Sequence, residues 1–199
     1  MKENEKPPRI VVAWIALSNR LLTVELCFSA LLLIGLLVTI MTNVITRYVG
    51  MPIYWVNELA IFILAWLAFV GTSSMARLRL DFAITFLSDA APERTARALK
   101  IGSIAVTIAF GLAVASMSWL WLDPAGLFSA GFDIRAFSRE TGNFLYSETT
   151  VALNWPRWIV MIVVPIFAVT LTFHAVANLF EELYRLRRTA TAPFEEETV

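Results

Sequence analysis

Two charged side chains, Arg47 and Glu58, lie on either side of a short connection between two apolar segments. Gly50 and Pro52 within "YVGMPIY" favour a turn, so the two segments should form an antiparallel hairpin with both charges at one membrane level. A charge near hydrocarbon is costly, and an opposite charge lowers the cost. We therefore expect Arg47 and Glu58 to interact, which would fix the hairpin or dock a partner. The alternative is that Glu58 reaches water without a partner.

Three further residues have types that can do chemistry, namely His174, Ser73 and Ser74. A haem or a metal usually needs more ligands than one histidine, so His174 is expected to be packed or hydrogen-bonded. A nucleophilic serine needs a base, and no convincing base is placed near the serine pair. The lone Cys27 cannot form an internal disulfide. We predict no catalytic residue, no cofactor, no metal site and no enzyme activity.

The composition indicates the medium that surrounds these residues. Hydrophobic residues make up 58% of the chain and charged residues 16%, whereas soluble domains carry about 25% charged residues. The formal net charge is zero, so no basic field favours nucleic acid as a partner. The sequence therefore indicates a membrane protein.

Four apolar segments are long enough to cross a bilayer, which takes roughly 20 residues. Their backbones must form their own hydrogen bonds in hydrocarbon, so the segments are helices. The predicted fold is an all-α integral membrane protein with four transmembrane helices and short interfacial helices, in one transmembrane domain over 21–183. The segments lie between Glu25 and Arg47, Glu58 and Arg77, Lys100 and Asp123, and Arg157 and Glu181.

Lysine and arginine are concentrated in the N-terminal arm, in the connection near residues 77–100 and in the tail. Such residues favour the cytoplasmic side. We expect both termini to be cytoplasmic, with residues 184–199 as a tail. The hairpin near Gly50 and the long connection 123–154 would face outward.

Two segments near the membrane surface leave alternatives open. Residues 1–20 form a cytoplasmic arm in which Ile10, Trp14, Leu17 and Leu21 share one helical face. This arm is either an interfacial helix or a downward extension of the first span. Residues 81–100 are predicted to form a short interfacial helix, a break and the base of the third span.

The third span carries small residues at helical spacing, which let helices approach closely. They could contact a partner, or they could serve packing within this chain. These helix-packing candidates are Ser103, Thr107, Gly111 and Ala115.

The first two spans also carry a family resemblance. The stretch "NVITRYV…PIYWVNELAIFILAWLAFVGTSSMARL" resembles the signature of DctQ-type small membrane subunits of TRAP (tripartite ATP-independent periplasmic) transporters. The matching residues are Asn43, Arg47, Tyr48, Trp55, Glu58, Leu59, Trp66, Gly71, Ala76 and Arg77. Asp81 and Thr85 stand where the family usually has a histidine and an aspartate.

The resemblance implies a division of labour in a bacterial inner membrane. A large multi-spanning subunit would carry an organic acid with a coupling cation, usually sodium, and a periplasmic binding protein would capture the substrate. This chain, surrounded by membrane lipids, would scaffold the large subunit and help dock the binding protein. The candidates for the hairpin and for docking are Asn43, Arg47, Tyr48, Trp55, Glu58 and Arg77.

Two other classes remain open on the residues alone. A self-sufficient small carrier acting as an oligomer would need a charged or polar transport site at mid-membrane. A membrane enzyme would need a clustered acid, base or metal constellation. The sequence displays neither feature.

Overall fold

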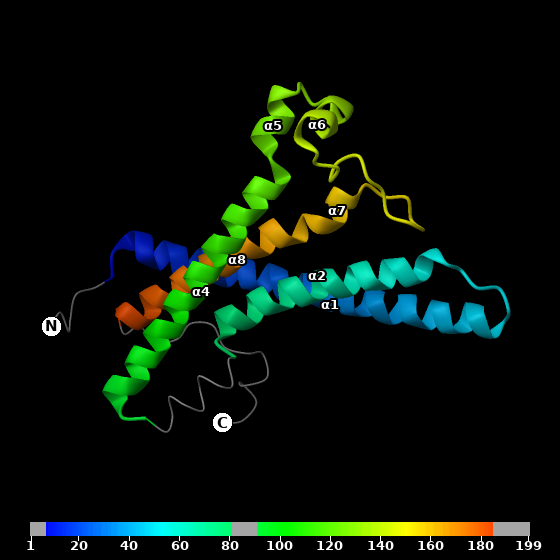
Figure 1. The fold of residues 1–199 in the computed structure, drawn as a ribbon. Coiled ribbons are helices and arrows are strands. Elements are labelled where there is room, and N and C mark those ends of the chain that lie inside the picture. The colour runs from blue at the N-terminus through cyan, green and yellow to red at the C-terminus, as the bar shows by residue number, and fades with distance from the viewer. Residues whose placement is uncertain (1–6, 81–90, 185–199) are drawn as a thin grey trace. The chain divides into compact units, whose positions relative to one another are not determined.

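The computed structural model describes residues 7–80 and 91–184, and seven helices lie within them (Figure 1). Four stretches are long and apolar enough to span a membrane, which confirms the predicted fold class. Asp81, Thr85 and the first part of the segment 81–100 fall outside the described residues, whereas the base of the third span is present as a helix that begins at Glu93. The helices are α1 (Arg9–Tyr48), α2 (Trp55–Leu78), α4 (Glu93–Leu122), α5 (Pro124–Ser129), α6 (Ile134–Thr141), α7 (Arg157–Met161) and α8 (Val163–Leu183).

Helix α1 runs for 40 residues without a break. At 1.5 Å per residue this is about 60 Å, roughly twice the hydrocarbon thickness of a bilayer. The first turns of α1 therefore continue the first span as one helix. That these turns lie along the membrane surface stays a prediction. Ile10 and Leu17 are exposed, whereas Val11, Ile15, Ser18, Leu22 and Glu25 form the buried face.

The chain divides into two compact units. Unit 1 comprises Met1–Cys27, Gly71–Ala113 and Ala168–Val199, and unit 2 comprises Phe28–Val70 and Val114–Phe167. Each long helix contributes one end to each unit.

In unit 1, aromatic and small residues bring helices together. The Trp14 ring of α1 stacks on Phe173 of α8 with ring centroids 4.4 Å apart, and its indole N–H donates to the Phe173 carbonyl at 3.2 Å. A Cβ built on Gly111 of α4 would lie 2.2 Å from the Thr172 hydroxyl of α8. Glycine is therefore needed at this crossing.

In unit 2, α1 and α2 form the expected antiparallel hairpin, drawn in cyan in Figure 1. Phe28 of α1 meets Trp66 of α2 edge to face, with centroids 6.0 Å apart. The Trp66 indole donates to the Val160 carbonyl at 3.0 Å. That carbonyl lies beside the interruption between α7 and α8.

Proline explains this interruption. Pro165 has no N–H to give to the carbonyl of Met161, the last residue of α7, and its ring crowds that carbonyl. The last span thus consists of a short helix, a break at Ile162 and a longer helix.

The connection between α4 and α7 is ordered into two short helices. Asp123 adopts a left-handed conformation with φ 40°, and its carboxylate caps α5 by accepting from the Gly126 N–H at 2.9 Å. Asp133 caps α6, and Gly142 ends α6 with φ 69°. Phe137 is fully buried against Tyr146.

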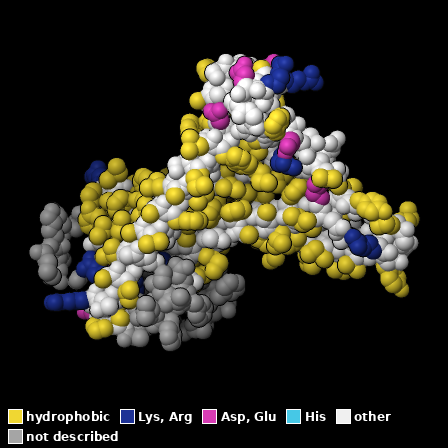
Figure 2. All heavy atoms as spheres, in the orientation of Figure 1, with side chains coloured by type: hydrophobic (Ala, Val, Ile, Leu, Met, Phe, Trp, Pro, Cys, Tyr) yellow, Lys and Arg dark blue, Asp and Glu magenta, His cyan; other side chains and the backbone are white. Residues whose placement is uncertain are grey.

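On the face drawn in Figure 2, hydrophobic side chains cover most of the helix surface and charged side chains occupy few places. In the 18 most apolar residues of α1, only 11% are buried within the chain. Apolar surface of this extent requires lipid or another protein around it.

Candidate functional site

Glu58 lies in the first turn of α2, where its carboxylate accepts three consecutive backbone N–H groups. Oε1 accepts from Val151 at 2.8 Å, and Oε2 accepts from Ala152 and Leu153, each at 2.7 Å. The helix dipole adds a favourable field at this position. Glu58 therefore fixes the segment before α7 to the start of α2.

This arrangement contradicts the expected ion pair between Arg47 and Glu58. The Arg47 Nε donates instead to Asn43 Oδ1 at 3.1 Å, and Asn43 Nδ2 donates to Asn57 Oδ1 at 2.6 Å. The prediction failed because it considered only charges close in sequence, whereas three aligned N–H groups from a distant segment satisfy the carboxylate directly. Of the other hairpin candidates, Tyr48 is 92% exposed and Trp55 is 45% exposed.

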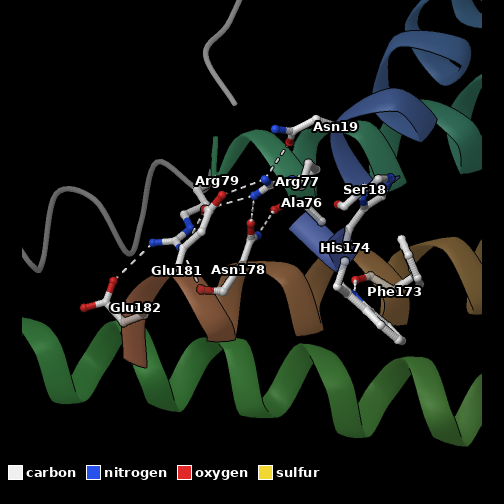
Figure 3. Close-up of polar contacts among 11 residues, drawn as sticks. Ser18, Asn19, Ala76, Arg77, Arg79, Phe173, His174, Asn178, Glu181 and Glu182 are labelled. Atoms are coloured by element: carbon white, nitrogen blue, oxygen red, sulfur yellow. Dashed lines mark hydrogen bonds and ion pairs between the residues drawn. The ribbon is translucent and has the colours of Figure 1, made fainter. Parts of the chain in front are cut away.

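Arg77, the remaining candidate, is not at the hairpin but at the far end of α2, where it is completely buried. Its guanidinium forms two bonds with the Glu181 carboxylate of α8, at 2.7 and 3.0 Å (Figure 3). It also donates to Asn178 of α8 and to Asn19 of α1, the latter at 2.6 Å. One side chain thus joins three helices.

Two more arginines extend this network. Arg79 pairs with Glu182 at 3.2 Å and donates to the Asn178 carbonyl at 2.6 Å. Arg97 of α4 lies 3.9 Å from the Glu182 carboxylate. The network therefore reaches all four long helices within unit 1.

A second buried cluster surrounds Glu25 of α1. Its carboxylate accepts from Ser73 at 2.9 Å and from Ser74 at 3.2 Å, and it lies 3.1 Å from His174 Nε2. The Nδ1 of His174 bonds the Ser18 hydroxyl at 2.7 Å. The expectation that His174 is hydrogen-bonded is confirmed.

The order Ser18, His174, Glu25 is that of a serine triad, in which an imidazole lies between a hydroxyl and a carboxylate. Here Ser18 and His174 are fully buried and Glu25 nearly so, and all three side chains are enclosed by the helices of unit 1. Among residues 7–80 and 91–184, no group of three His, Cys, Asp or Glu residues could hold a metal ion. The arrangement suits structure rather than chemistry.

The helix-packing candidates lie on the inner side of α4. Gly111 is buried against α8, and Ser103, Thr107 and Ala115 are partly buried. At Gly111 the small residue serves packing within this chain, which was one of the two alternatives.

Sequence reasoning missed the members of both clusters other than Arg77, His174 and the two serines. A signal was present, because His174, Asn178 and Glu181 follow the spacing of one helical face. Ser18 and Glu25 repeat the same spacing in α1. Polar residues aligned on one face of an apolar helix indicate a buried polar contact.

Comparison with known proteins gives one finding. The family model for tripartite ATP-independent periplasmic transporters, DctQ component, matches residues 36–185. The chain belongs to the DctQ family. No curated protein and no solved structure matches the chain.

The DctQ match and the four apolar helices together make this chain a multi-pass membrane component of a tripartite transporter. Arg77, Asn178 and Glu181 lie inside the region matched by the DctQ model, whereas Asn19 and Glu25 precede it. The buried clusters thus join the matched region to the first turns of α1.

Proposed function

We propose that this DctQ component is a scaffold for the large transporting subunit and helps to dock the substrate-binding protein. The assembled transporter would take up an organic acid together with sodium, across an inner membrane. In this arrangement both termini of the chain are cytoplasmic, and the connection between α4 and α7 faces outward. The chain itself would catalyse no reaction and hold no cofactor.

The contrast between exposed and buried side chains carries this proposal. In the most apolar parts of α1 and α4, 11% of residues are buried within the chain. The buried charged groups of unit 1, Glu25, Arg77 and Glu181, instead bond side chains within this chain. Such a chain offers apolar helix surface to a membrane partner and keeps its polar groups for its own structure.

The outward connection supports the docking part of the proposal. Phe128 and Phe132 meet edge to face with centroids 6.0 Å apart, although they are 71% and 66% exposed. Phe132 also has φ 63°, a strained value for a bulky residue. Exposed aromatic anchors and strained backbone are both common at binding surfaces.

The scaffold is tested by copurification with the large subunit. The tagged chain is coexpressed with both partners. In one variant Ile34 and Val38, which are exposed on the surface of α1, are changed to serine. In the matched control variant the exposed Ile10 and Leu17 are changed to serine instead. We expect the first pair to reduce recovery of the large subunit. Elution of the unaltered chain without its partner would contradict the scaffold.

Docking is tested by photocrosslinking from Phe128 and Phe132 to the binding protein. Adducts from these positions, and none from Arg97, would support docking and its membrane orientation. Failure at both phenylalanines while the transporter still takes up substrate would contradict it.

The absence of a transport site in this chain is tested with the chain alone in proteoliposomes. We expect no saturable binding of sodium or of an organic acid, and no uptake. Uptake by the isolated chain would instead favour the self-sufficient oligomeric carrier.

A further inference from the structure

An open cleft of about 450 Å³ lies in unit 2, beside the end of α4. Its walls come from the last turn of α4, from the last residue of α6 and the segment that follows it, and from the first residue of α7. The lining residues are Leu120, Trp121, Thr141, Gly142, Asn143, Phe144, Leu145, Glu148 and Arg157.

Hydrogen bonds to the last carbonyls of α4 give this cleft a fixed wall. Asn143 Nδ2 donates to the Trp121 carbonyl, and the Tyr146 hydroxyl donates to the Leu122 carbonyl, both at 2.7 Å. Burial, and then the nearby Asp123 charge, raise the pKa of Tyr146, so its hydroxyl keeps the proton that it donates. The segment is therefore attached to the end of a membrane span.

The polar side of the cleft carries one anion and one cation. Glu148 and Arg157 form an ion pair, and the Arg157 backbone N–H donates to the Glu148 carbonyl at 3.0 Å. Both side chains are 45% exposed. The ion pair joins Arg157 Nη1 to Glu148 Oε2, and because each side chain is nearly half exposed, both groups can bond a ligand as well as each other.

The apolar side of the cleft lies where a span ends. Leu120, Trp121 and Phe144 line this side and are exposed, and Trp119 is exposed in the same last turn of α4. Tryptophans at the end of a span favour the headgroup level of a bilayer. The cleft therefore opens where lipid headgroups meet the acyl chains.

We propose that this cleft binds the headgroup of phosphatidylethanolamine. The headgroup has a phosphate that suits the Arg157 guanidinium and a primary ammonium that suits the Glu148 carboxylate. Its glycerol and upper acyl carbons would contact Leu120, Trp121 and Phe144. A purely anionic headgroup would satisfy Arg157 but bring a second negative charge to Glu148.

The experiment uses zero-length carbodiimide coupling on the full chain in vesicles of phosphatidylethanolamine and phosphatidylglycerol. The reagent joins a carboxylate to a primary amine with loss of water, and the lipid adduct is located by peptide mass spectrometry. We expect lipid on Glu148 at least about fivefold more often than on exposed Glu140. Equal labelling of the two glutamates would overturn the proposal.

Substitutions of Arg157 distinguish a lipid-binding site from a glutamate that only lies close to lipid. Arg157→Gln removes the phosphate partner and also frees Glu148, so closeness alone predicts equal or greater coupling. We expect coupling to fall about fivefold, Arg157→Lys to retain most of it, and Arg139→Gln, outside the cleft, to leave it unchanged. Unchanged coupling in Arg157→Gln would overturn the proposal.

A second measurement uses the unaltered chain, so its result does not depend on whether these variants fold. Native mass spectrometry of the unaltered chain, incubated with equal amounts of the two lipids, should show preferential retention of phosphatidylethanolamine. Equal retention of the two lipids would overturn the proposal.

Discussion

Units 1 and 2 both contain charged side chains on membrane-spanning helices, but they satisfy these charges differently. In unit 1, Arg77 and Glu25 are buried and bond mainly to side chains of other helices. In unit 2, Glu58 is partly exposed and bonds to the backbone of a connecting segment. One arrangement fixes helices to each other, and the other fixes a loop to a helix end.

This difference sets what each unit tolerates. A buried ion pair is specific for its partners, and removing one partner leaves an uncompensated charge in a medium that does not solvate it. A carboxylate that accepts backbone N–H groups makes no demand on the side chains of the segment that it holds. We therefore expect the sequence of residues 151–153 to vary more freely than that of the Arg77 partners.

The largest effect is expected for Arg77→Met, which leaves the Glu181 carboxylate buried without its main partner. The loss of stability should be about 3–5 kcal/mol, measured by denaturant unfolding of the full chain in detergent. In the double variant Arg77→Met/Glu181→Met most of the stability should return, because neither charge remains. A single variant as stable as the unaltered chain would break the comparison.

Glu25→Gln comes next. Glutamine keeps one acceptor oxygen but turns an N–H₂ group toward the serine hydroxyls and His174, so unfolding should need about 1–3 kcal/mol less. Exposed Glu140→Gln is the matched control and should change little. Equal losses in the two variants would show that burial does not distinguish the charges of the two units.

Glu58→Gln should act locally. We expect hydrogen exchange at Val151, Ala152 and Leu153 to quicken by roughly an order of magnitude, while unit 1 exchanges as before. Arg47→Gln should leave these amides unchanged, and the two substitutions should add. Non-additive effects of the two substitutions would instead support an interaction between Arg47 and Glu58 and would contradict the comparison.

The smallest effect concerns Asp133, the cap of α6. Its bonds from the Ala136 and Arg135 N–H groups, with the charges of Arg139 and Arg135, lower the pKa of the carboxyl. Its stabilisation of α6 is therefore complete above about pH 4 and lost as the pH falls through the lowered pKa. Amide shifts of Arg135 and Ala136 should report this titration, and Asp133→Asn should abolish it. Persistence of the transition in Asp133→Asn would assign it to another group.

The sequence predicted the parts of the structure that depend on hydropathy and local stereochemistry. Four long apolar segments became four spans, and Gly111 allows a close helix crossing. Each of these inferences needs only the properties of a segment and its neighbours.

Partner identity could not be predicted in this way. Arg77 is separated from Glu181 by 104 positions, and Glu58 from Val151 by 93. Helical periodicity shows which face carries a polar group, but not which other face meets it. Glu25 was taken for the flank of a span, although the structure buries it beside His174.

The buried clusters also set the order in which the protein can mature during synthesis. Asn19 and Glu25 emerge from the ribosome first, whereas His174, Asn178 and Glu181 emerge last. Until the fourth span is inserted, the nascent chain carries a carboxylate and a guanidinium without their main partners beside lipid. A chain that stops before the fourth span therefore leaves Glu25 and Arg77 without these bonds to α8.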